Sequence, residues 1–132
     1  MPTRTLSLAA IASLTSALLL TAGLSSAGAT RTVTISSHIT IKGKGLTFSG
    51  NVTSSKAACK AGRKVTLYRK GSLVLGSTTT NSSGHWKITV SAGSAGITLG
   101  HFYAKAKKRS EGTAGTIYVC KAATSPTVPY RP

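Results

Sequence analysis

The sequence predicts an all-β domain, a sandwich of two sheets with about seven strands, behind a cleaved signal peptide. Short runs in which apolar and polar residues alternate fill the chain after residue 30, and this two-residue period is typical of half-buried strands. Gly, Ser and Asn separate the runs, whereas no long run has the 3.6-residue period of an amphipathic helix. This spacing of turns favours two sheets packed on their apolar faces.

The expected strands follow one another between Val33 and Val119. Their apolar positions are Val33 and Ile35; Ile39 and Ile41; Leu46, Phe48 and Val52; Val65 and Leu67; Leu73 to Leu75; Trp86, Ile88 and Val90; Phe102, Ala104 and Ala106; and Ile117 and Val119. Neighbouring residues of a strand point to opposite faces of a sheet. We therefore expect Trp86 in the core and His85 in solvent.

The first 29 residues have the pattern of a secretory signal peptide. Arg4 precedes an apolar stretch from Leu8 to Leu24, and Ala27-Gly28-Ala29 offers small residues for cleavage. Ser and Thr interrupt the stretch, which disfavours a transmembrane anchor. We expect a secreted, extracellular protein. Its single domain is expected at residues 46–125, after an N-terminal strand or arm at 30–45 and before a Pro-rich tail at 126–132.

Cys59 and Cys120 are the two cysteines of the chain. An exported protein matures under oxidising conditions, where a pair of cysteines usually forms a bridge. No histidine spacing next to them indicates a zinc site. The sequence therefore predicts one structural disulfide that joins the region before the Val65 strand to the last strand.

The balance of charge excludes several classes of enzyme. Seventeen Lys and Arg residues face one acid, Glu111, so the formal net charge is +16. A chain with a single carboxylate cannot build a glycosidase carboxylate pair, a multi-carboxylate Ca²⁺ or Mg²⁺ site, or a Ser-His-Asp triad. His38, His85 and His101 lack the spacing of a metal site. We expect no enzyme activity, no cofactor and no metal, and we place Glu111 in a Ser-Glu-Gly loop.

Several motifs along the predicted sandwich domain resemble a known superfamily. They are Phe48-Ser49-Gly50-Asn51-Val52, Gly62 to Tyr68, Thr80 to Trp86, Gly100 to Ala104, and Cys120 with Ser125. This order resembles that of transthyretin-like (prealbumin-like) and carboxypeptidase-regulatory-like modules, as found in small secreted β-sandwich proteins of actinobacteria, the high-GC Gram-positive bacteria. The resemblance covers about residues 46–125 and implies an immunoglobulin-like sandwich. It implies no catalytic residues, and such modules more often contact other molecules than catalyse reactions.

The basic residues carry the best indication of function. Solubility of a small domain requires a net charge of only about 2 to 8, so the excess suggests an anionic partner. Basic side chains interleaved with aromatic ones are typical of surfaces that bind polyanions. The candidate residues are Lys64, Lys70, Lys105, Lys107, Lys108 and Arg109, with Tyr68 and Tyr103 on the same faces.

We expect a secreted binding or structural module, a monomer, for an extracellular polyanion or cell-wall polymer. Teichoic acid, acidic polysaccharide, anionic membrane surfaces and released DNA all remain open as partners, and no element for reading a nucleic-acid sequence is visible. The alternative is a cationic antimicrobial protein or toxin that acts on anionic envelopes. Such a protein normally carries an amphipathic cationic segment, and the mature chain shows none.

Overall fold

The computed structural model describes residues 28–91, 93 and 100–132, and this part of the chain is all-β. The expected signal peptide and part of the loop expected at Ser91–Gly96 lie outside the described residues. One short 3₁₀ turn, η1 (Ala57–Cys59), accompanies the strands. The strands are β1 (Arg31–Ile35), β2 (Ser37–Ile39), β3 (Lys42–Lys44), β4 (Thr47–Ser54), β5 (Lys64–Arg69), β6 (Leu73–Thr79), β7 (His85–Thr89), β8 (His101–Ala106), β9 (Arg109–Thr113), β10 (Thr116–Cys120), β11 (Ala123–Thr124) and β12 (Val128–Pro129).

The first sheet is built around β4, which pairs with β2 and β3 on one side and with β7 on the other. Ile39 lies opposite Val52 and Lys42 opposite Ser49, so β2 and β3 keep one register across the break between them. Gly50 of β4 lies against the main chain at this break, because a Cβ at residue 50 would lie 1.9 Å from the Thr40 carbonyl oxygen. Only glycine leaves room for this close approach.

The second sheet has the order β11-β8-β5-β6, and β12 also pairs with β8. Ser125 lies between β11 and β12, where its hydroxyl accepts a hydrogen bond of 2.8 Å from the Ala104 N–H. The hydroxyl thus replaces a main-chain acceptor where this edge of the sheet is irregular. Strand β12 falls in the expected Pro-rich tail, and β2 and β3 fall in the expected N-terminal arm, so the paired strands extend beyond 46–125 at both ends. Pro129 is tolerated because an edge strand has no outer neighbour that needs its N–H.

The core lies between these two sheets. Phe48 of β4 and Phe102 of β8 contact each other with ring centroids 4.8 Å apart, and both side chains are fully buried. Trp86 is buried and His85 is exposed, which confirms the predicted facing of β7. The core cluster comprises Ile39, Phe48, Val52, Val65, Leu67, Trp86, Ile88, Val90, Phe102, Ala104 and Ala106.

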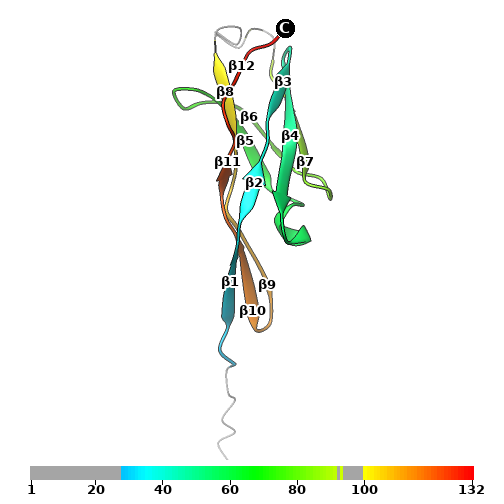
Figure 1. Ribbon diagram of the computed structural model, residues 1–132, viewed down its shortest axis with the longest axis vertical. Coiled ribbons are helices and arrows are strands. Elements are labelled where there is room, and N and C mark those ends of the chain that lie inside the picture. Colours follow the sequence, from blue (N-terminus) through cyan, green and yellow to red (C-terminus); the bar gives the residue numbers. More distant parts are fainter. Residues whose placement is uncertain (1–27, 92, 94–99) are drawn as a thin grey trace, which may run out of the picture.

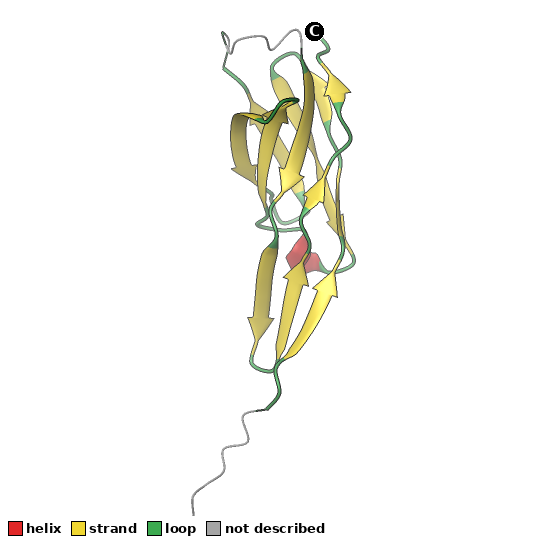
Figure 2. Cartoon of the chain, turned by 90° about the vertical axis from the view of Figure 1, so that its left-hand side faces the viewer, coloured by secondary structure: helices red, strands yellow, loops and turns green. Residues whose placement is uncertain are grey.

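A third sheet, of β1, β10 and β9, extends beyond one end of the two facing sheets (Figure 1; Figure 2). Strand β1 runs parallel to β10, whereas β9 and β10 form an antiparallel hairpin. Glu111 lies in β9, opposite Tyr118, so the expectation of a loop at this residue was wrong. The described residues form twelve strands where the sequence indicates about seven, because β9, β11 and β12 were not expected and the expected strand at Ile39 and Ile41 is divided into β2 and β3.

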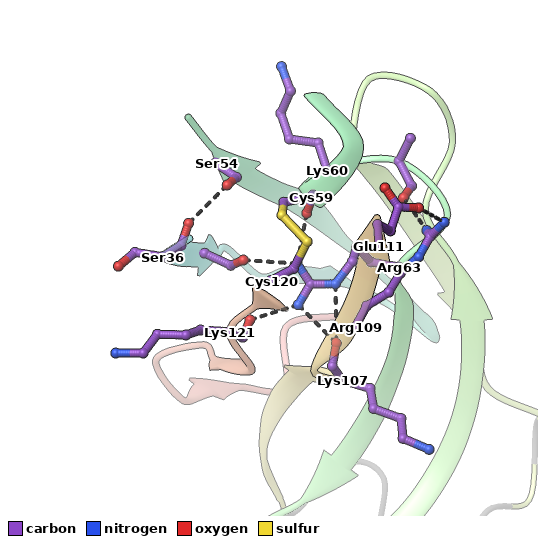
Figure 3. The surroundings of a disulfide bond; sticks show 12 residues. Ser36, Ser54, Cys59, Lys60, Arg63, Lys107, Arg109, Glu111, Cys120 and Lys121 are labelled. Carbon is purple, nitrogen blue, oxygen red and sulfur yellow. Dashed lines mark hydrogen bonds and ion pairs between the residues drawn. A yellow bond between two sulfur atoms is a disulfide. The ribbon is translucent and has the colours of Figure 1, made fainter. Parts of the chain in front are cut away.

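The predicted disulfide is present. Cys59 and Cys120 are bonded and fully buried, and the bridge joins η1 to the end of β10 at the base of the extension (Figure 3). It therefore fixes the third sheet to the region that leads into β5.

Candidate functional site

The outer face of the second sheet holds a groove of about 500 Å³ that is rich in lysine. It runs across β5, β8 and β11. The lining residues are Lys64, Thr66, Tyr68, Lys105, Ala106, Lys107, Lys108, Ala122, Ala123 and Thr124. Four of the eight candidate residues predicted from the sequence are lysines of this lining, and Tyr68 is a fifth.

Strand pairing explains why the side chains meet on one face. Lys64, Thr66 and Tyr68 alternate along β5 with the buried residues Val65 and Leu67, so they share the outward side. On β8, Thr66 faces Lys105 and Tyr68 faces Tyr103. These directly opposed pairs place the aromatic and basic side chains side by side.

The two tyrosines form a stacked pair beside a lysine. The ring centroids of Tyr68 and Tyr103 are 5.2 Å apart, with 9° between the ring planes. The Lys105 Nζ lies 5.5 Å from the Tyr68 ring centroid and 5.7 Å from that of Tyr103. Both distances fall within the range of cation–π attraction, so the Lys105 ammonium group lies next to a rigid aromatic surface.

No carboxylate neutralises the lysines of the groove. Lys64, Lys105, Lys107 and Lys108 are all exposed. The one acid of the chain, Glu111, pairs with Arg109 on β9 instead, and this is the only ion pair among the residues that the structure describes. The groove therefore presents four positive charges to solvent.

A buried arginine fixes the main chain at one end of the groove. Arg63 directly precedes β5 and is fully buried. Its Nε and Nη2 donate to the Lys107 carbonyl at 3.1 and 2.9 Å, and Nη2 also donates to the Lys121 carbonyl at 2.8 Å. Its Nη1 donates to the Cys59 carbonyl at 2.7 Å and to the Ser37 hydroxyl at 2.8 Å (Figure 3).

The guanidinium thus joins four separate segments without a carboxylate partner. Burial lowers the pKa of Arg63, and the positive charge of Arg109 lowers it further. A buried cation is tolerated when hydrogen bonds replace its hydration, and the five bonds match the five donors of a guanidinium. Because the Lys107 carbonyl accepts two of them, the segment that carries Lys107 and Lys108 is held at the groove.

The importance of Arg63 was missed in the sequence, although the alternation contained a signal. Val65 and Leu67 point inward, so the residue two positions before Val65 belongs on the same side as them. A charge there indicates either a strand end or a buried anchor. The sequence does not identify the partners, because two of the three main-chain carbonyl groups, those of Lys107 and Lys121, belong to distant segments.

Two of the predicted residues lie elsewhere. Lys70 is exposed in the turn after β5 and does not line the groove. Arg109 begins β9 rather than extending the basic surface as a loop, and its Nη1 donates to the Ala61 carbonyl at 2.8 Å. Its Nη2 donates to the Glu111 carboxylate, so Arg109 supports the extension.

The three histidines lie on different strands, His38 on β2, His85 on β7 and His101 on β8. Within residues 28–91, 93 and 100–132, no three His, Cys or acidic residues gather as a metal site would require. In the same part of the chain, no helix has the length and apolar character needed to cross a membrane.

Comparisons with protein-family models, with curated proteins and with solved structures find no match for this chain.

Proposed function

We propose that this protein is a secreted, non-catalytic module that binds anionic extracellular polymers through the groove on β5 and β8. The observation that carries the proposal is the stacked Tyr68–Tyr103 pair, which lies beside lysines that no carboxylate neutralises. Four lysines within one groove attract a chain of repeated negative charges, because each contact releases counterions from the polymer.

The aromatic pair adds a contact that charge alone does not supply. Tyrosine has an apolar ring with a polar hydroxyl tip, so the pair can contact the rings of a polymer while the lysines pair with its anionic groups. Both tyrosines lie on paired strands, and a rigid sheet loses little entropy when it binds. We expect affinity that depends on charge density and on salt, with little dependence on the sequence of repeating units.

The proposal also includes an immunoglobulin-like sandwich fold and export of the chain from the cell. If β2 and β3 count as one strand, and β11 and β12 as another, the two facing sheets contain three and four strands. This count supports a seven-stranded immunoglobulin-like sandwich, of the kind that the resemblance to transthyretin-like modules implies. The buried disulfide supports passage through an oxidising compartment, in line with a signal peptide at residues 1–29 and an extracellular site of action.

A pair of matched variants tests the groove. The groove variant K105Q/K107Q/K108Q and the control R31Q/K56Q/K60Q each remove three positive charges, but none of the control residues lines the groove. Affinity for immobilised heparin, for teichoic acid and for duplex DNA is measured at two salt concentrations. The groove variant should flatten the log–log salt slope on duplex DNA by about 2 to 3, and the control should change it by less than about 1.

The tyrosines are tested separately with Y68A/Y103A. Loss of affinity for heparin at an unchanged salt slope is expected, because the substitution removes ring contacts and no charge. Equal effects of the groove variant and the control would show that binding follows net charge and not the groove, and would overturn the proposal.

A further inference from the structure

The outer face of the first sheet carries a second set of lysines, on the opposite side of the molecule from the groove. Lys42 and Lys44 lie on β3 and Lys87 lies on β7, with β4 between the two strands. Lys42 is opposite Ser49 of β4, and Ser49 is in turn opposite Lys87. These residues line a hollow of about 470 Å³, which we call the hydroxyl face; its lining is Lys42, Gly43, Lys44, Thr47, Ser49, His85 and Lys87.

On β4, between the two strands that carry the lysines, the hydroxyl face is lined by the hydroxyl side chains of Thr47 and Ser49. Thr47 and Thr89 lie opposite each other on β4 and β7, and their hydroxyl oxygens are 3.3 Å apart. Hydroxyl groups flanked by lysines can donate hydrogen bonds to phosphate or sulfate oxygens. The imidazole of His85 is the one ring in this lining, which contains no tyrosine, tryptophan or phenylalanine, so its charges and hydroxyl groups favour anionic groups over polymer rings.

The lysines of the hydroxyl face are available for an anionic ligand. Lys42, Lys44 and Lys87 are exposed, and the only side-chain carboxylate of the chain, that of Glu111, is bound by Arg109 in the third sheet. The three charges lie on the two strands that flank β4, and the registers of β3 and β7 on β4 fix their spacing.

One straight polymer segment cannot contact both faces. Phe48 of β4 and Phe102 of β8 meet inside the molecule, so Ser49 and Tyr103, their neighbours in sequence, point to opposite outer sides. Facing sheets lie about 10 Å apart, and the side chains on both outer faces add to that separation.

We infer that one molecule holds two segments of anionic polymer at once, one in the groove and one on the hydroxyl face, and so bridges polymer chains. This inference rests on the proposed function of the groove. The ligand of the hydroxyl face is a second stretch of the same extracellular polymer, recognised by its phosphate or sulfate groups. Such a bivalent protein would join chains into a network, whereas a protein with one face would only coat them.

A two-step capture experiment tests the bridge, with heparin as the probe. Heparin is immobilised, the mature protein is bound to it, and fluorescent soluble heparin is added at physiological salt. The wild type should capture the second heparin. The hydroxyl-face variant K42Q/K44Q/K87Q should still bind the immobilised heparin through the groove, but its capture of the soluble chain per bound protein should fall at least tenfold.

Two further variants separate this inference from the proposed function. The groove variant K105Q/K107Q/K108Q should also lose capture per bound protein at least tenfold while it retains binding through the hydroxyl face. The control R31Q/K56Q/K60Q carries the same charge as both and should keep capture within about twofold. A wild type that binds heparin but captures no second chain overturns the bridge and leaves the groove intact as a binding site, whereas failure to bind heparin, teichoic acid or DNA at all overturns both.

The mass of the protein in solution tests whether a dimer, and not a single molecule, could capture the second polymer chain. Light scattering without polymer should give a monomer. A stable dimer whose two grooves bind separate chains would explain capture without the hydroxyl face, and in that case K42Q/K44Q/K87Q would capture as well as the wild type. That result would overturn the inference that one molecule bridges two chains. Binding to anionic vesicles without any binding of soluble heparin would overturn it as well.

Discussion

The guanidinium of Arg63 donates two hydrogen bonds to one main-chain carbonyl, that of Lys107, at 3.1 and 2.9 Å. The two residues are 44 positions apart in the chain, and one precedes β5 while the other follows β8. Lys107 lines the groove, so a buried structural residue positions an exposed candidate binding residue. This link makes stability and binding separable: substitution of the Lys107 side chain leaves its carbonyl in place, whereas substitution of Arg63 removes its donors.

Arg63→Lys should therefore destabilise the fold. A lysine keeps the charge, but it has three donors in place of five and cannot reproduce the planar fork. Buried carbonyls that lose their donors cost about 1 to 3 kcal/mol each, so we expect a loss of about 2 to 4 kcal/mol in the free energy of unfolding, measured by urea denaturation. Arg31→Lys, at an exposed position of β1, should change it by less than about 0.5 kcal/mol. Similar values for the two would show that the buried hydrogen bonds contribute little.

Reduction of the Cys59–Cys120 bond should lower stability by about 2 to 5 kcal/mol, as in other small secreted domains. The cysteines are 61 positions apart, and the chain-entropy model gives about 4 kcal/mol for a loop of that length. Denaturation with and without a reductant measures the difference. Two free thiols in the purified native protein, detected as a mass two hydrogens above that of the bridged chain, would contradict the bond.

The facing of β7 can be measured with a neighbouring pair of substitutions. Trp86 is buried in the core and His85 is exposed, so Trp86→Ala should cost about 3 to 5 kcal/mol. His85→Ala should cost less than about 0.5 kcal/mol. If the two costs were equal, the strand would face the other way in solution.

The secreted protein should begin at Thr30. Ala27-Gly28-Ala29 supplies the small residues that a signal peptidase requires. N-terminal sequencing of the protein collected from culture medium measures this directly. Recovery of the chain only from cells, with Met1 in place, would argue against export.

Local pattern was enough to predict the parts of the fold that alternate strictly. On β7 and β8 the inward residues Trp86 and Phe102 were predicted, because each lies in a run of period two. The outward lysines and tyrosines of the groove follow from the same period. The disulfide was predicted as well, because only one pairing of two cysteines exists.

Features that depend on distant segments could not be predicted in this way. The parallel pairing of β1 with β10 joins residues 85 positions apart, and nothing in either run specifies the partner. Glu111 was placed in a loop because of the glycine that follows it, but β10 provides the missing pairing. The prolines near the C-terminus suggested a tail, yet edge pairing with β8 accepts Pro129. Arg63 was missed for the same reason, since its acceptors come from four separate segments.

The most direct test of the proposed function is the salt dependence of binding, measured with the wild-type mature protein. A short DNA duplex serves as the probe, because its response per neutralised phosphate is known: the log–log slope is about −0.9 for each one. Contact with the four lysines of the groove predicts a slope between about −3 and −5, with no preference among duplex sequences. Absence of binding at low salt, or binding that does not change with salt, would contradict the polyanion-binding function and leave the positive charge without a role in recognition.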